Sequence, residues 1–340
     1  MNNNASKPAA IEARSKIAPK KHYLLAIASV IFIVAAVFFL INHTAIVDTF
    51  KGIGYNPTPD MLTVKQSLQL TDEGTRIFNA TRPLLASSDD FNSSCESHDE
   101  AVSVLGCYTG DRIYIYNVDD ASLPGIREST AAHELLHAIW NRLTGLEKSE
   151  LVPVLEQVYS QQSGNLHETI ESYPEDERIG ELYVRIATQI TSLPDALETH
   201  YAKYFSDQDK VASFYNSYIK PFNELNNQIT QLKAELDALN AEITEKTAYL
   251  DGRVSVFDSA VAEFNRCANI AGCFSSEYAF NTRRAELVRE QQSINAENAA
   301  LNEIIDAYNQ KAEVYNSSII RSTELQNIIN SNSPTTKIEE

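Results

Sequence analysis

The sequence predicts an α+β protein that is mostly α-helical overall, with one N-terminal transmembrane helix, a mixed domain, and a long antiparallel helical hairpin that forms a coiled coil. Three observations predict this class: an uncharged apolar run at residues 23–41, an alternating strand pattern at 101–118 followed by helical segments, and heptad spacing from about residue 216. The expected boundaries are 1–21 for a cytoplasmic basic tail, 22–42 for the transmembrane helix, 43–60 for a linker, 61–215 for the mixed domain, 216–330 for the hairpin, and 331–340 for a disordered tail.

The apolar segment "YLLAIASVIFIVAAVFFLI" at residues 23–41 carries no charge over a length that crosses a bilayer core as a helix. A buried core helix usually has a polar stripe, and this segment has none. The closest alternative is a cleaved signal peptide, which has a shorter apolar region and a small-residue cleavage site that is not found after Ile41. Three lysines precede the segment and predict a cytoplasmic N-terminus, with everything after about residue 45 on the extracytoplasmic side: Lys16, Lys20 and Lys21.

The charge is distributed unevenly along the chain. The net charge is −18, although residues 1–21 contain five basic groups and one acidic group. The rest of the chain is therefore strongly acidic, which disfavours a nucleic-acid partner because few groups remain to neutralise phosphates.

Four cysteines follow the apolar segment in two local pairs. An even number of cysteines in an exported domain favours disulfides, and we expect Cys95–Cys107 and Cys267–Cys273. The other connectivities, and a zinc site formed by all four cysteines, remain alternatives, although the tight spacing typical of such zinc sites is missing.

Residues 61–90 are weakly helical, and residues 101–118 have the pattern of a β-hairpin that turns at Gly110-Asp111. A helix is expected from about Arg127 to Leu143, with Gly145 placed to end it. Three more helices are expected at 147–162, at 175–190 (opening after Pro174), and at 193–205.

Apolar residues in the C-terminal part step by four and three over more than six heptads, which strongly indicates a coiled coil. A second helical run follows the loop that contains Cys267 and Cys273, so the two arms predict an antiparallel hairpin. The hairpin is interpreted as a spacer or as an arm for a coiled-coil partner or self-association. The alternative is a lid or substrate guide across the mixed domain.

The segment "AAHELLHAIW" at residues 131–140 contains the spacing of a metal site. On a helix, His133 and His137 lie on one face, so both imidazoles can bind one ion, and Glu134 lies close enough to act as a general base. Zinc in such a site acidifies water and polarises a carbonyl. The alternative is a surface helix with two exposed histidines.

This "HELLH" after an apolar strand resembles the zincin superfamily of zinc metallopeptidases, over about residues 105–205. The resemblance implies a zincin-like fold for residues 61–215, a Zn²⁺ cofactor, and catalysis by Glu134. It also implies that the strand "RIYIYNV" holds an extended protein or peptide substrate. The metzincin pattern of a Gly and a third His is absent after His137, so the resemblance is to the gluzincin type, whose third ligand is a glutamate on a later helix.

Glu181 is the expected third ligand, because it lies mid-helix beside Gly180, which permits close approach of another backbone. It lies off the apolar stripe of its helix, so the alternative is a solvated glutamate paired with Arg185. The other candidates for this position are Glu177, His167 and His200.

His200 and Tyr201 have the chemistry of a donor that stabilises the oxyanion of the transition state. Their alternative role is helix packing. Taken together, the patterns predict a membrane-anchored zinc metallopeptidase that hydrolyses peptide bonds on the extracytoplasmic side. The alternatives are an envelope scaffold with a degenerate domain and a metal-dependent hydrolase of another bond.

Overall fold

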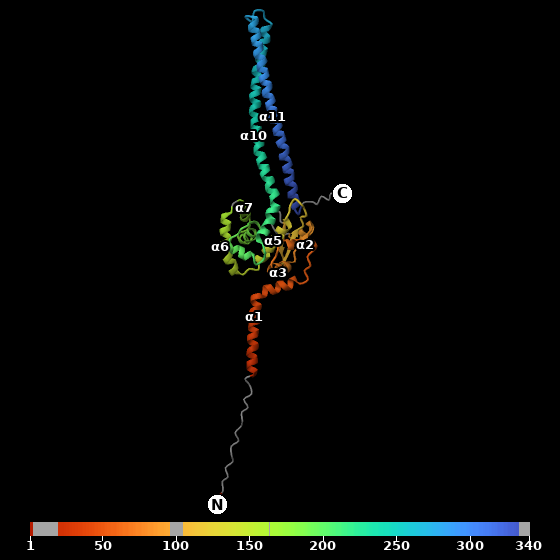
Figure 1. The fold of residues 1–340 in the computed structure, drawn as a ribbon, viewed down its shortest axis with the longest axis vertical. Coiled ribbons are helices and arrows are strands. Elements are labelled where there is room, and N and C mark those ends of the chain that lie inside the picture. The colour runs from red at the N-terminus through yellow and green to blue at the C-terminus, as the bar shows by residue number, and fades with distance from the viewer. Residues whose placement is uncertain (3–19, 96–104, 163, 333–340) are drawn as a thin grey trace.

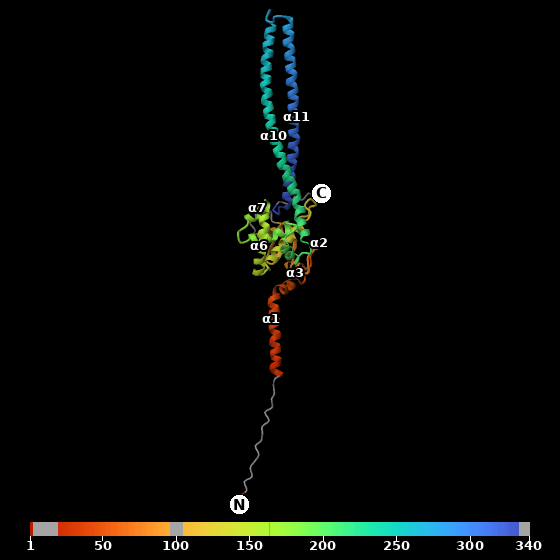
Figure 2. The same ribbon diagram turned by 60° about the vertical axis from the view of Figure 1, so that its left-hand side comes forward.

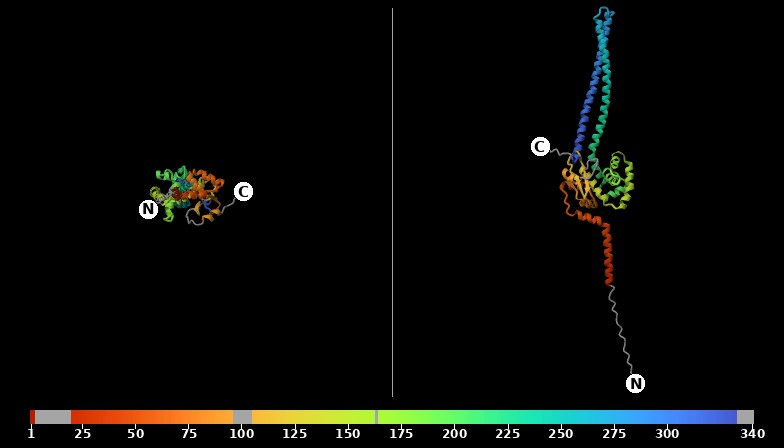
Figure 3. Two further views of the ribbon diagram at one scale, coloured as in Figure 1. Left: turned by 90° about the horizontal axis from the view of Figure 1, so that it is seen from below. Right: turned by 180° about the vertical axis from the view of Figure 1, so that it is seen from behind.

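The computed structural model describes residues 1–2, 20–95, 105–162 and 164–332. Most of the predicted basic tail (1–21) and of the predicted disordered tail (331–340) falls outside these residues. A small mixed domain lies in the middle, with helix α1 (Lys20–Gly52) leaving it at one end and a long helical hairpin at the other (Figure 1). The view from behind shows the same arrangement (Figure 3).

The domain is built mostly of helices around one small sheet, as the sequence predicts. Its elements in chain order are α2 (Pro59–Ser67), α3 (Asp72–Thr81), β1 (Leu84–Ala86), α4 (Ser88–Ser94), β2 (Gly106–Thr109), β3 (Arg112–Tyr116), α5 (Ile126–Trp140), α6 (Gly145–Gln161), α7 (Asn165–Ser172), α8 (Arg178–Gln189) and α9 (Asp195–Tyr201).

The predicted β-hairpin is confirmed where the structure describes it, since β2 and β3 pair antiparallel across Gly110-Asp111. Ile113 and Ile115 are fully buried and face the core. The strand order is β1-β3-β2, with β1 parallel to β3, so β3 is the central strand. The sequence-based expectation that "RIYIYNV" forms the substrate-binding edge is therefore wrong, because both sides of β3 are already hydrogen-bonded.

Three local predictions are corrected by the structure. The segment 84–86 is a strand rather than part of a helix, because α3 ends at the left-handed residue Arg82 (φ 46°) and the chain then pairs with β3. Helix α5 ends at Trp140, and Gly145 begins α6 instead of ending α5, because Thr144 and Glu147 form a capping box there. Helices α4 and α7 were not predicted.

The predicted linker 43–60 is helical up to Gly52. No proline or glycine lies between Lys20 and Lys51, and this part of α1 packs against α3 and contacts Arg142, which follows α5. Asp48 is buried on the inner face of α1 and accepts two hydrogen bonds of 2.9 Å from the Arg142 guanidinium, which follows α5. Arg142 also donates to the Ala138 carbonyl oxygen (2.7 Å). The ion pair thus fixes α1 to the end of α5.

Replacing Asp48 with alanine should destabilise the protein by about 3–5 kcal/mol, because it leaves the Arg142 guanidinium buried without its carboxylate. Chemical denaturation of the full chain measures this loss. Asp111→Asn is the control, because Asp111 pairs with Lys51 nearby but is largely exposed, and asparagine tolerates the left-handed backbone at this position (φ 66°). It should cost at most about 1 kcal/mol. Equal losses in the two variants would contradict the prediction.

Among the described residues, no single helix is both long and apolar enough to span a membrane. The two parts of α1, Leu25–Phe39 and His43–Gly52, meet this criterion only together, and they are bent by 67° with respect to each other.

The predicted helical hairpin is confirmed (Figure 2). Its arms are α10 (Gln208–Ala268) and α11 (Glu277–Ile329), and the 61 residues of α10 give it a length of roughly 90 Å at 1.5 Å per residue. Arg253 forms ion pairs with Glu290 and Glu297 across the arms, which fixes their relative register. The predicted Cys267–Cys273 disulfide closes the loop at the tip.

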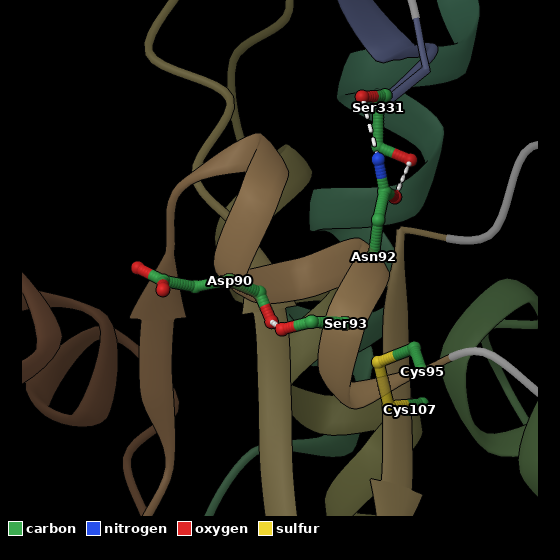
Figure 4. Close-up of a disulfide and its surroundings, with 6 residues drawn as sticks. All are labelled: Asp90, Asn92, Ser93, Cys95, Cys107 and Ser331. Atoms are coloured by element: carbon green, nitrogen blue, oxygen red, sulfur yellow. Dashed lines mark hydrogen bonds between the residues drawn. A yellow bond between two sulfur atoms is a disulfide. The ribbon is translucent and has the colours of Figure 1, made fainter.

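The end of α11 returns to the domain and packs there. Leu325 is buried against Val118, Leu123 and Ile126 at the start of α5. The Ser331 carbonyl oxygen accepts a hydrogen bond from the Asn92 amide (3.0 Å), close to the predicted Cys95–Cys107 disulfide, which is also formed (Figure 4). Both arms of the hairpin are therefore anchored on the domain.

Candidate metal centre

Helix α5 has one face in the core and the other in a cavity. Its apolar face is fully buried and consists of Ala131, Ala132, Leu135, Leu136, Ala138 and Ile139. This burial fixes the rotation of the helix, so that His133 and His137, half-buried, lie on the cavity side with Nε2 atoms 3.2 Å apart. The predicted shared face of the two histidines is therefore present in the folded protein.

Helix α8 brings Glu181 to the two histidines. Its Oε1 lies 3.0 Å from His137 Nε2, and its Oε2 lies 3.9 Å from His133 Nε2. A Cβ atom at Gly180 would come within 3.1 Å of the Trp140 indole nitrogen, so glycine at this position allows α8 to pack closely on α5. The expected close approach of another backbone at Gly180 is not found, because the neighbour there is the Trp140 side chain.

One ligand atom from each of His133, His137 and Glu181 lies within 4.8 Å of the other two. Two imidazoles and one carboxylate are a ligand set that catalytic zinc sites use, with a further coordination position left open. These three residues can bind a metal ion, and their chemistry fits zinc.

Charges around the cluster favour an ionised Glu181. Burial by itself raises the pKa of this carboxyl group, but the hydrogen bond from His137 and the charges of His133, His137 and Arg185 outweigh it and lower the pKa to about 2. Arg185 Nε donates to Glu181 Oε2 at 3.2 Å, and Arg185 Nη2 donates to the Tyr173 hydroxyl at 2.9 Å. Glu181 is only 6% exposed, so the surface role considered from its sequence position is excluded, while the pairing with Arg185 is real.

Burial, the His137 charge and the Arg185 charge lower the pKa of His133 to about 3, against the opposing effect of Glu181. The imidazole is therefore neutral near pH 7, the state in which it binds a metal. A neutral histidine beside an ionised carboxylate is a pair of ligands already in the protonation states that coordination requires.

Glu134 lies directly beside the edge strand β2. A Cβ atom at Gly106 would come within 2.8 Å of Glu134 Oε1 and within 2.6 Å of Thr130 Cγ2. Gly106 therefore lets the backbone of β2 pass over the carboxylate without a side chain between them. Glu134 is buried, and it lines the same cavity as the three potential ligands.

The cavity has a volume of about 400 Å³, and its wall includes the start of α10, at the expected boundary between the mixed domain (61–215) and the hairpin (216–330). Tyr215, in the expected domain, and Tyr218, in the expected hairpin, line it together with Arg185 and Tyr173. Heptad spacing starts near these tyrosines, so the sequence could not separate helix–helix packing from a role at the site. The first turns of α10 in fact pack against α5 and α8.

Two predicted site residues do not reach the cavity. Tyr183 Oη lies 3.0 Å from His200 Nε2, and the Tyr201 hydroxyl donates to the Tyr183 carbonyl oxygen at 2.8 Å. Both side chains are buried in the core behind α8, so the packing alternative describes them, and the expected oxyanion role is wrong. Of the other ligand candidates, Glu177 lies at the exposed rim of the cavity, and His167 stacks on Tyr159 outside it.

His200 should make the protein less stable in acid. Burial and the Lys203 charge lower its pKa to about 4 against the opposing effect of Glu147, whereas the unfolded chain has an ordinary value near 6.5. Protons therefore bind the unfolded state first, and up to about 3 kcal/mol of stability should be lost as the pH falls from about 6.5 to about 4.

Urea denaturation at several pH values between 7 and 4 tests this effect of His200. The control variant is His200→Gln, which keeps a polar partner for the Tyr183 hydroxyl but cannot take up a proton in this range. The stability of this variant should depend less steeply on pH. The same dependence in both proteins would contradict the prediction.

No family model matches the chain, and no curated protein or solved structure gives a significant match to it. The function is therefore inferred from the residues and geometry of the site itself.

Proposed function

We propose that this protein is a membrane-anchored, zinc-dependent peptidase whose catalytic domain lies outside the cytoplasm. The observation that carries the proposal is the convergence of His133, His137 and Glu181 beside Glu134 at the edge of a sheet. His133, His137 and Glu181 would hold the zinc ion, which would supply the Lewis acidity that acidifies water and polarises a peptide carbonyl. Glu134 takes the proton of the attacking water and transfers it to the leaving amine.

The edge strand β2 can hold an extended peptide over Glu134. Strand β2 pairs antiparallel with β3, and the Tyr116 amide at the end of β3 donates to the Leu105 carbonyl oxygen just before β2. In an antiparallel pair, only every second residue is hydrogen-bonded to the partner strand. Counted from Leu105, the backbone polar groups of Gly106 and Tyr108 therefore point away from β3, outward from the described sheet. Pairing with these groups would align the backbone of a substrate with the catalytic glutamate.

The tyrosines of α10 are the candidates for stabilising the oxyanion, because Tyr215 and Tyr218 line the cavity and the previously expected His200 and Tyr201 do not. Phenol hydroxyls are suitable hydrogen-bond donors for this role. If one of them acts in this way, its replacement by phenylalanine should reduce kcat about 10²- to 10³-fold with little change in KM. Steady-state kinetics of Tyr215→Phe and Tyr218→Phe measure this effect.

Tyr204→Phe is the control for these variants, because Tyr204 is a buried aromatic of the domain outside the cavity wall. It should leave kcat unchanged. Wild-type kcat in both α10 variants would exclude the two tyrosines as donors.

The experiment that tests the proposed function is a peptidase assay of the full chain with a mixed peptide library. Cleavage should require zinc, disappear with a chelator, and return when zinc is added. If the zinc-loaded protein cleaves no peptide, the favoured alternative is a membrane-tethered scaffold. The exposed apolar residues at the hairpin tip, Ile270 and Tyr278, are the specific observation that supports this second function.

A further inference from the structure

The second part of α1 is amphipathic, and its apolar face points away from the domain. Asp48 is buried against Arg142 on the inner face. At 100° per residue, Phe50 turns toward the opposite side and is 69% exposed, and Ile53, which follows the last residue of the helix, is 64% exposed. These side chains contribute little to the domain core, and water is an unfavourable environment for them.

The first part of α1 continues this apolar surface. Large hydrophobic side chains are exposed on all sides of residues 25–39, as expected for a helix surrounded by lipid. The bend of 67° between the two parts places His43–Gly52 across the base of the domain (Figure 2). Ile46 lines a recess in the bend together with Val30, Val34 and Phe38, and the recess has no polar surface.

We propose that residues 43–53 lie on the extracytoplasmic surface of the bilayer and that Phe50 and Ile53 contact lipid. A lipid surface is the partner that fits this apolar face for two reasons. The face continues from residues 25–39, which have the composition of a bilayer anchor. The opposite face of the same helix is fixed to the domain. Helices that lie in the membrane interface have this division into one apolar and one polar face. The base of the domain therefore rests on the membrane, and the hairpin points away from it.

Fluorescence quenching by brominated lipids tests the proposal on the full chain in vesicles. Trp140 is the single tryptophan of the protein, and its emission is subtracted as background. Tryptophan introduced by Phe50→Trp or Ile53→Trp should be quenched by lipids brominated in the upper acyl chain, and its emission should shift to shorter wavelength.

Val256→Trp is the matched control, because Val256 is 71% exposed on α10, in the hairpin that leaves the domain at the end opposite to α1 (Figure 1). Its emission should not respond to brominated lipid. If quenching at positions 50 and 53 does not exceed that at 256, the proposal is overturned, whether these side chains are in water or are covered by another protein chain.

A separate observation extends the proposed peptidase function, on which the following inference depends. Strand β2 and helix α5 both run from the metal cluster toward the second part of α1, which packs on the domain. The catalytic cavity is lined by residues 105–108 and by one face of the segment 129–141, and a second cavity of about 750 Å³ is lined by residues 108–111, 141–142 and several residues of α1. The two cavities share Tyr108 and Asn141.

A peptide paired with β2 would thus extend from the catalytic glutamate to the base of the domain, where α1 lies. The distance from Gly106, beside Glu134, to Thr109, in the wall of the second cavity, is about 10 Å for extended chain. We infer that the substrates are membrane-anchored proteins that are cleaved in the extended stalk just outside the bilayer.

Cleavage of tethered peptides tests this inference. A sequence that the zinc-loaded enzyme cleaves as a free peptide is attached to a transmembrane anchor through linkers of increasing length, in vesicles that contain the full-length enzyme. Cleavage should be fastest with linkers of roughly four to eight residues between the scissile bond and the bilayer, since each extended residue spans about 3.3 Å. It should become slower with linkers of about twenty residues.

Two results would overturn the stalk inference while leaving the peptidase function intact. One is a cleavage rate that rises steadily with linker length. The other is a free peptide that is cleaved as fast as the tethered peptide at the same total concentration. Failure to cleave any free peptide with zinc present would instead contradict the peptidase function.

Discussion

Replacing Glu134 with glutamine should abolish peptide hydrolysis while leaving the metal bound. Glutamine has nearly the same shape but cannot accept the proton of the attacking water, so kcat should fall about 10²- to 10⁴-fold. The zinc content should not change, because Glu134 is not among the three residues that form the ligand cluster. Zinc analysis and steady-state kinetics of the same preparation measure both results.

Glu128→Gln is the matched control, because Glu128 lies in the first turn of the same helix and does not line the cavity. The same chemical change at this position should leave kcat unaffected. Hydrolysis by Glu134→Gln within tenfold of the wild-type rate would exclude Glu134 as the general base.

Removing a ligand should release the metal from the folded protein. Wild-type protein should bind about one zinc per chain, and His137→Ala or Glu181→Gln should weaken binding by at least about 100-fold, since even partners outside the ligand set contribute 10- to 100-fold. Competition with a zinc chelator measures the affinity, and circular dichroism shows whether each variant has folded. Glutamine is used at position 181 because it still offers a polar partner to Arg185.

Glu177→Gln is the control for the Glu181 variant, since Glu177 precedes α8 by one residue and lies at the exposed rim of the same cavity. It should bind zinc as wild type does. If Glu181→Gln binds zinc normally and Glu177→Gln does not, the third ligand is assigned to Glu177. If the His137→Ala variant binds zinc as wild type does, His137 is not a ligand, and the cluster of His133, His137 and Glu181 is excluded as the zinc site.

The helices and disulfides followed from local patterns. Heptad spacing predicted the two arms of the hairpin, and the local cysteine pairs predicted both disulfides. Among the local predictions, the one for Gly145 failed because a capping box in the next helix decided the boundary. The short strand β1 was missed because three residues give no periodicity, and only pairing with β3 stabilises it.

The candidate site was predictable where it depends on one helix and uncertain where it depends on packing between helices. His133 and His137 share a face because an α-helix has 3.6 residues per turn, whatever surrounds it. Glu181 was ambiguous because a glutamate four residues before an arginine is equally common on a surface helix. His200 and Tyr201 have suitable chemistry, but they lie behind α8 rather than in the cavity.

The sequence by itself therefore determined the mostly helical class, the hairpin, both disulfides and the pair of histidines with their neighbouring glutamate. Only the tertiary structure decided that Glu181 joins them, that β2 is an edge strand of the described sheet, and that Tyr215 and Tyr218 line the cavity. The physical reason is that the periodicity of a sequence shows which residues share a face of one element. Which element packs against that face depends on the close approach of side chains such as Trp140 to glycines such as Gly180, and these contacts join distant parts of the chain.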